Sequence, residues 1–162
     1  MLSVNPEQQR EHYGNQRNDR RRVQRISGAC LSRPPGCSYE NQPYVVPIHF
    51  AHEDTYLYGF STFGQKVKWM RANPKVCVQT DKIENQGEWI SVIVYGEYEE
   101  LPEPQYTAER KHARSLLARH YHWWLNALGE RQMRLGENSI EPFFFRIRIQ
   151  SMSGLRATEA EG

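Results

Sequence analysis

The sequence predicts a mainly β domain, a small antiparallel barrel with flanking helices. Short runs rich in β-branched and aromatic residues recur between turn signals, which is typical of strands joined by short connections. The clearest run, residues 143–150, alternates apolar and polar side chains with a period of two. A longer run, 89–101, contains Gly96, where we expect a bend that favours a barrel over a sandwich. The whole pattern predicts five or six strands and two helices.

We expect one folded domain between two tails. At 162 residues the chain is long enough for a single domain with an adequate core. Residues 1–36 are mostly polar, with three arginines at 20–22, and carry too few apolar side chains to offset the entropy of ordering them. We therefore place an N-terminal tail at 1–36, the domain at 37–154 and a C-terminal tail at 155–162.

Two apolar runs open the domain and predict a pair of strands. Residues 43–50 form the first run and residues 56–60 the second. A turn at Glu40 and Asn41 is expected to lead into the first run. Pro47 interrupts that run, and proline cannot donate a hydrogen bond to a neighbouring strand. It therefore predicts an open edge or a bulge at this position.

The second strand leads into residues 61–66, Ser-Thr-Phe-Gly-Gln-Lys, and then into a helix expected over about 63–72. In one interpretation Ser61 or Thr62 caps this helix and Lys66 is a solvated charge. In the other, the free N–H groups, the helix dipole and the Lys66 ammonium together hold a phosphate. The local pattern alone favours the first interpretation, because capped helices far outnumber phosphate sites.

A third strand and a long fourth strand are expected after this helix. The helix should end at Asn73, and residues 75–80 should form the next strand. Alternation places Cys77 on the face opposite its two valine neighbours, and no thiolate-stabilising partner is evident in the sequence, so we expect an inert thiol. A polar loop over 81–88 then leads to the strand at 89–101.

The pattern over residues 109–128 predicts the second helix. Its expected apolar stripe contains Ala113, Leu116, Leu117, His120, Trp124 and Leu128. His112 and His120 are eight residues apart and could share a face, but no carboxylate accompanies them at ligand spacing. Ordinary surface or packing histidines are therefore favoured over metal ligands.

The period-two strand at 143–150 is expected to face the core with one half of its side chains. Phe143, Phe145, Ile147 and Ile149 form the core half. Arg146 and Arg148 then face away from the core, towards solvent, a subunit partner or an anionic ligand. Gly154 is expected to end the domain.

Composition argues against several classes of function. A net charge of +2 is too small to argue for nucleic acid, and no apolar run is long enough to span a membrane. The three cysteines show neither the spacing of a zinc site nor an even count, which favours reduced thiols and the cytoplasm. Four tryptophans in so short a chain point to core, interface or the walls of a pocket for a flat ligand.

Four segments in a fixed order carry a resemblance to a known family. They are Pro43-Tyr-Val-Val-Pro-Ile, Leu57-Tyr-Gly-Phe-Ser-Thr-Phe-Gly-Gln-Lys, Met70-Arg-Ala-Asn-Pro-Lys-Val-Cys-Val and Trp89-Ile-Ser-Val-Ile-Val-Tyr-Gly. Together they resemble the pyridoxamine 5′-phosphate oxidase-like proteins, in particular the branch with the nitroimidazole-resistance reductases, over about residues 37–154. The resemblance implies an FMN-binding split barrel, antiparallel and Greek-key-like, that forms a homodimer with FMN at the interface.

The resemblance also implies which residues bind the cofactor. The isoalloxazine ring would lie along Val46, Pro47 and Ile48. The phosphate and ribityl chain would be held by Ser61, Thr62, Gln65 and Lys66, and Trp89 and Ser91 on a neighbouring strand would help to close the site. In the light of this set, phosphate binding becomes the preferred interpretation of residues 61–66.

The chain departs from the family pattern in two places. Members usually open with a helix and a Gly-Arg-Leu-type strand, and residues 25–35 show neither. The first barrel strand is therefore missing, displaced or formed by an unusual sequence. A histidine that some nitroimidazole reductases carry in the second strand falls here at Gly59.

Two functions from different classes fit this resemblance. The first is an oxidoreductase that passes electrons from NAD(P)H through FMN to a small acceptor molecule. The second is a non-catalytic protein that binds a flavin, a deazaflavin or haem, since fold does not fix function. Oxidation of pyridoxamine phosphate itself is disfavoured, because the Arg/His pair for the substrate phosphate is not found near the end of the chain. No side chain stands out as a general acid or base, so no catalytic residue is assigned.

Overall fold

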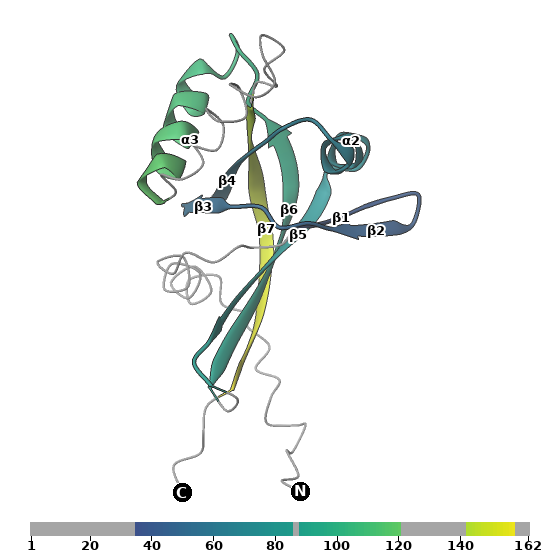
Figure 1. Ribbon diagram of the computed structural model, residues 1–162, viewed down its shortest axis with the longest axis vertical. Helices are drawn as coiled ribbons and strands as arrows, with labels where there is room; N and C mark the ends of the chain where they lie inside the picture. The colour runs from purple at the N-terminus through teal and green to yellow at the C-terminus, as the bar shows by residue number, and fades with distance from the viewer. Residues whose placement is uncertain (1–34, 86–87, 121–141, 158–162) are drawn as a thin grey trace, which may run out of the picture.

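The computed structural model describes residues 35–85, 88–120 and 142–157, which form one seven-stranded sheet and two helices (Figure 1). The strands are β1 (Pro35–Tyr39), β2 (Gln42–Val45), β3 (Phe50–Glu53), β4 (Tyr56–Ser61), β5 (Lys75–Ile83), β6 (Trp89–Glu100) and β7 (Phe143–Ala157). The helices are α2 (Gln65–Ala72) and α3 (Thr107–His120). The predicted mainly β fold with two helices is confirmed, with one strand more than the upper estimate.

The sheet must curl, because strands that are neighbours in the chain lie at its two opposite edges. The strand order is β2-β1-β5-β6-β7-β4-β3, and every pairing is antiparallel. Only residues 46–49 join edge strand β2 to edge strand β3. This link spans at most about 18 Å, whereas seven strands laid flat would separate the edges by about 29 Å. The two edges therefore approach each other, which gives the predicted split barrel.

Two apolar cores lie on opposite faces of this curved sheet. The first core fills the barrel and contains Cys37, Ile48, Phe50, Leu57, Met70, Val76, Val78, Val92, Val94, Tyr98, Phe145 and Ile147. The second lies beneath α3 and contains Ala51, Tyr58, Leu101, Ala113, Leu116, Leu117 and Phe144. Figure 1 shows α3 and α2 at separate places around the upper part of the sheet, while β5, β6 and β7 continue downward past both.

A tight hairpin of β1 and β2 forms the first barrel strand from an unusual sequence. Glu40 and Asn41 both have positive φ angles, 50° and 63°, as the two central residues of a type I′ hairpin turn require. The predicted turn is therefore confirmed, and the strand that precedes it is present as β1. This strand begins at Pro35, so the N-terminal tail cannot extend to residue 36 as expected.

The prediction of one strand over residues 43–50 is wrong. The run divides into β2 and β3, which lie at opposite edges of the sheet with residues 46–49 between them. Pro47 lies in this link and in neither strand, so it interrupts the run and does not form the open strand edge or bulge that was expected. A periodicity argument could not find the division because residues 43–50 form an almost continuous apolar run.

Gly96 forms the bend expected in the long strand. The register of β6 against β7 shifts between Tyr95 and Gly96. A Cβ at Gly96 would lie 2.5 Å from the backbone oxygen of Arg148, so only glycine permits this close approach. The bulge kinks the strand and lets the barrel curve at this point.

Two strands are longer than predicted. β5 runs to Ile83, through part of the segment expected to be a loop, and β7 passes Gly154 and ends at Ala157. β7 thus continues three residues beyond the boundary expected at residue 154. Pairing across β6 explains the extension, because Ile83 and Ala157 are both register partners of Trp89.

The arginines on the outer face of β7 form ion pairs with the neighbouring strand. Arg146 pairs with Glu99 at 2.8 Å, and Arg148 pairs with Glu97 and Glu99 of the neighbouring strand β6. Phe144, on the same outer face, is buried beneath α3. Both guanidinium groups are therefore compensated by carboxylates of β6.

Both predicted helices are present. α2 ends before Asn73 as expected, and α3 buries Ala113, Leu116 and Leu117. The expected continuation of α3 to residue 128, with Trp123 and Trp124, and the three arginines at 20–22 lie outside the described residues.

Candidate functional site

The first turn of α2 offers unused hydrogen-bond donors. Gly64 is the N-cap residue and provides no side chain, and no side-chain cap is formed. The Val67 and Lys68 amides bond to the Gly64 oxygen, at 3.1 and 3.2 Å. The amides of Gln65 and Lys66 precede them and have no acceptor within the helix. The N-terminus of α2 is thus open to an acceptor from outside the helix.

Neither hydroxyl at the end of β4 caps this helix. The Ser61 hydroxyl, on a side chain that is 5 % exposed, donates to the Thr62 carbonyl oxygen at 2.9 Å. The interpretation of Ser61 or Thr62 as a simple helix cap is therefore wrong. Ser61, Thr62, Gln65 and Lys66 all fall in the segment that joins the end of β4 to the first turn of α2; we call residues 61–66 the cradle.

The charge of the cradle is positive and uncompensated. The side chain of Lys66 is half-buried, and this burial holds its pKa below the ordinary lysine value. Lys66 forms no ion pair within the described part of the chain, and the first turn of α2 contains no acidic residue. The helix dipole adds to this positive charge, so the cradle favours an anion.

The link between β2 and β3 passes along the opening of the barrel. Ile48 is buried in the barrel core, Val46 is half-buried against it, and Pro47 is exposed. The Val46 amide donates to the Pro35 oxygen at 3.3 Å, which attaches the link to β1. The three residues assigned to the ring thus form an apolar border where the two edges of the sheet meet.

Trp89 and Ser91 lie far from the cradle within one chain. Ser61 is the register partner of Phe143, and Ser91 is the register partner of Leu155. These two partners are twelve residues apart on β7, which is about 40 Å along the strand. Figure 1 shows the corresponding lower part of β5, β6 and β7 pointing away from α2. A single chain therefore does not bring the two groups of predicted residues together.

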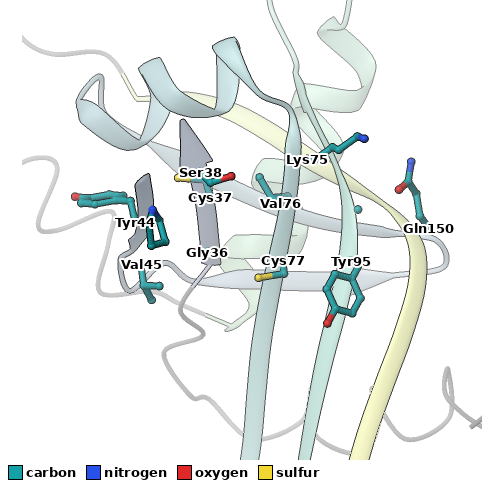
Figure 2. Close-up of a pocket in the computed structure, with 12 residues that line it drawn as sticks. Gly36, Cys37, Ser38, Tyr44, Val45, Lys75, Val76, Cys77, Tyr95 and Gln150 are labelled. Atoms are coloured by element: carbon teal, nitrogen blue, oxygen red, sulfur yellow. The ribbon is translucent and has the colours of Figure 1, made fainter. Parts of the chain in front are cut away.

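The sequence did not reveal a hollow on the outer face of the sheet (Figure 2). A cavity of about 450 Å³ lies over β2, β1, β5 and β6. Its floor is a row of register partners, Val45, Gly36, Cys77 and Tyr95. The exposed side chains of Val45 and Tyr95 stand on either side of the two small residues. Gly36 had been assigned to the tail, so the alternation of large and small residues across strands was not visible in the sequence.

Gly59 leaves no room for the histidine of some nitroimidazole reductases. It is buried on β4, and a Cβ there would lie 2.7 Å from the Phe145 ring and 3.1 Å from the Phe50 ring. These two core rings pack edge to face, with centroids 5.9 Å apart. A histidine at this position would require the barrel core to repack.

Neither a metal centre nor a membrane-spanning helix is found among the described residues. No group of three histidine, cysteine or acidic side chains lies close enough to hold a metal ion. His112 instead hydrogen-bonds to the Glu53 carboxylate, which joins α3 to β3. No described helix is long and apolar enough to cross a membrane.

Comparison with known proteins identifies the family to which this architecture belongs. Residues 36–156 match the family model described as pyridoxamine 5′-phosphate oxidase. The chain belongs to that family. A curated but uncharacterized protein of Rhizobium meliloti (strain 1021) is 39 % identical over 126 residues, which cover 77 % of this chain and 83 % of the relative.

Solved structures agree with the fold. A protein of Mesorhizobium loti, named as FAD-binding, is 37 % identical with a TM-score of 0.68, over 87 % of this chain and 94 % of the other. A Bacteroides thetaiotaomicron protein whose name links it to 5-nitroimidazole antibiotic resistance has a TM-score of 0.61 at 21 % identity, over 87 % and 88 %. At that lower identity the likeness shows the fold alone. The family resemblance and the split barrel are thus confirmed.

Proposed function

We propose that this protein is an FMN-binding flavoprotein whose cradle holds the 5′-phosphate of the cofactor. The observation that carries the proposal is the open N-terminus of α2, with no side-chain cap and no acid in its first turn, beside the half-buried Lys66. Two free amides and an ammonium suit a phosphate dianion, because charge-assisted hydrogen bonds are roughly twice as strong as neutral ones. The FAD-binding relative from Mesorhizobium loti supports a flavin, since FAD contains the FMN unit.

The isoalloxazine ring is proposed to lie along Val46, Pro47 and Ile48. These residues form the apolar border at the opening of the barrel. A flat heteroaromatic ring needs an apolar slot with a few backbone hydrogen-bonding groups, and a link between two strands supplies both. The link has few ladder bonds of its own, which leaves its backbone groups available to a ligand.

The site is proposed to be completed by a second copy of the chain. Trp89 and Ser91 cannot reach the cradle of their own chain, whereas a twofold dimer would bring them from the partner. Exposed apolar side chains near the far ends of β5 and β7, Ile83 at 72 % and Leu155 at 48 %, are suited to such an interface. Light scattering should give twice the chain mass of 19.1 kDa, and a monomer at micromolar concentration would contradict the dimer.

We propose that this flavoprotein is an oxidoreductase that uses a small molecule as electron acceptor. We place it in the cytoplasm. A bound flavin would supply hydride chemistry, taking electrons from NAD(P)H and delivering them to the acceptor. The protein's part is to bind and orient the cofactor, and no described side chain is assigned as an acid or base. The alternative is a protein that carries a flavin, deazaflavin or haem without turnover.

The absorbance spectrum of the purified protein tests this proposal. Flavin bands at about 370 and 450 nm that bleach on addition of NADPH are expected of the enzyme. Flavin bands that remain after addition of either NADH or NADPH would favour the alternative, a protein that carries the flavin without turnover. A Soret band would indicate haem and contradict FMN binding. A colourless protein that takes up no FMN when dialysed against it would contradict FMN binding as well.

A further inference from the structure

A single glycine opens the hollow on the outer face of the sheet (Figure 2). Gly36 lies between Val45 and Cys77 in the row of register partners, and a Cβ there would lie 3.0 Å from the Cys77 sulfur. The side chains of Val45 and Tyr95, 65 % and 45 % exposed, therefore stand as walls on either side of a low floor. A volume of about 450 Å³ between apolar walls is typical of sites for small molecules.

The bulge between β6 and β7 adds an amide to one edge of this hollow. Ser151 and Ile149 pair with consecutive residues of β6, so Gln150, which lies between them, has no register partner there. Ile149 and Met152 both pack against the barrel core, so the two residues between them face outward. Bulges re-aim side chains in this way, and here the exposed side chain of Gln150 lines the hollow.

Lys75 adds a positive charge at the same edge. It precedes Cys77 by two residues on β5, so the two side chains share the outer face of the sheet. Glu97, the register partner of Lys75, is already paired with Arg148. Neither the Lys75 ammonium nor the Gln150 amide has a side-chain partner within the described part of the chain. In Figure 2 the ends of these two side chains lie at one edge of the hollow.

We propose that the hollow binds a small aromatic carboxylate. The ligand's ring lies over Gly36 and Cys77 and stacks on the exposed Tyr95 ring. Its carboxylate accepts hydrogen bonds from the Lys75 ammonium and the Gln150 amide. One cation and one neutral donor suit a single negative charge, and the apolar floor disfavours a ligand that is polar all round. The site lies on the sheet face away from the barrel core and does not depend on a bound flavin.

Naphthoate is the probe that tests this site, and its neutral amide, naphthamide, is the matched control ligand. The NMR signals of the Val45 methyl groups in the full-length protein report on the hollow directly. Naphthoate should shift these signals with a dissociation constant of about 1 mM, as expected for so small a ligand. Naphthamide should bind about threefold to fivefold more weakly, because it cannot form an ion pair with the exposed Lys75.

Variants locate the two halves of the ligand. Lys75→Met should reduce the affinity for naphthoate to that for naphthamide, and Lys82→Met is the matched control on the same strand, since Lys82 pairs with Glu84. Tyr95→Ala should weaken both probes about fivefold, because it removes the stacking surface. Cys77→Phe should fill the hollow and abolish the binding of both probes. Thermal denaturation checks that each variant is folded.

Three outcomes would overturn the proposal. Equal affinities of the wild type for naphthoate and naphthamide would contradict a carboxylate site, as would equal effects of Lys75→Met and Lys82→Met. Binding that survives Cys77→Phe would show that the probe binds elsewhere on the protein. Val45 signals that shift with protein concentration and not with naphthoate would assign the hollow to a second copy of the chain.

Discussion

The two helices of this protein begin in opposite ways. α3 follows a turn in which the Thr107 hydroxyl donates to the Pro104 oxygen at 2.9 Å, and Glu109 provides a carboxylate in its first turn. α2 has no side-chain cap, no acid in its first turn, and Lys66 beside its open amides. An acid near a helix N-terminus stabilises the helix, and a lysine there opposes the dipole. α3 therefore begins as local stability favours, and α2 does not.

The difference shows that α2, and not α3, begins in a way that lowers its local stability. α3 serves the second core, in which Ala113 and Leu117 are fully buried. α2 buries only Val67 and Met70, over eight residues, and leaves its positive end unsatisfied. A helix terminus that is open, cationic and partly desolvated is unfavourable without a ligand, and binding an anion would relieve the cost. The comparison therefore predicts that changes in α3 alter stability, whereas changes at the start of α2 alter ligand affinity.

The largest effect is expected from the buried face of α3. Leu117→Ala should lower the free energy of unfolding by about 2–5 kcal/mol, because it removes a fully buried side chain and leaves a cavity. FMN affinity, measured where the variant is still folded, should not change. Urea denaturation measures the stability, with the exposed Val45→Ala as control. A parallel loss of FMN affinity would mean that α3 shapes the site and would break the comparison.

Lys66→Ala should show the opposite pattern. Its FMN affinity should fall by about 2–3 kcal/mol, or roughly thirty- to two-hundredfold, because one partner of a charge-assisted bond is lost. Thermal stability without ligand should not fall, since the half-buried ammonium forms no ion pair in the described structure and opposes the dipole of α2. Riboflavin lacks the phosphate and should bind both proteins almost equally. Equal FMN affinity in the two proteins would leave α2 as an ordinary helix with an open end.

Much of the fold could be predicted because local patterns determine it. The alternation of residues 143–150 and the glycine in β6 predicted their strands and the bulge. The division of residues 43–50 was not predictable, because an apolar run does not state which edge of a sheet each half joins. Similarly, Pro35 and Gly36 pair with β5 through long-range contacts, and no local signal marks them as strand residues.

The candidate site was predictable in part. The hydroxyls and the lysine of residues 61–66 indicate the start of a helix. The sequence could not show that Ser61 bonds to the Thr62 carbonyl instead of capping α2. The separation of Ser91 from the cradle follows from strand register, which a list of motifs does not contain.

Gln65→Glu would make the start of α2 resemble that of α3. A carboxylate in the first turn should raise the free energy of unfolding by about 0.3–1 kcal/mol through the helix dipole. The same charge should repel a phosphate and weaken FMN binding by about 1 kcal/mol, roughly fivefold. Ala108→Glu, in the first turn of α3, is the matched control and should leave FMN affinity unchanged. If Gln65→Glu stabilises the protein and binds FMN as before, then no anion is held at this end of α2.

The smallest effect is expected from pH and concerns Lys66 alone. Burial lowers the pKa of this lysine in the folded protein, whereas in the unfolded chain it keeps its usual value of about 10.4. Between these two values the unfolded chain binds more protons, so the contribution of Lys66 to stability rises with pH across this window. Below the window the cost of the buried charge is fully present. FMN affinity should change in the opposite direction, because it needs the protonated ammonium.

A Lys66→Arg variant makes this prediction specific, since its guanidinium stays protonated to about pH 12. As pH rises from neutrality through the folded pKa of Lys66, the wild type should lose FMN affinity, and the variant should lose less. Titrations of FMN at a series of alkaline pH values, with riboflavin in parallel, measure the difference and remove effects of the isoalloxazine ring. If wild type and Lys66→Arg lose FMN affinity together, a group other than Lys66 carries the phosphate. The open helix end and its lysine would then not form one site.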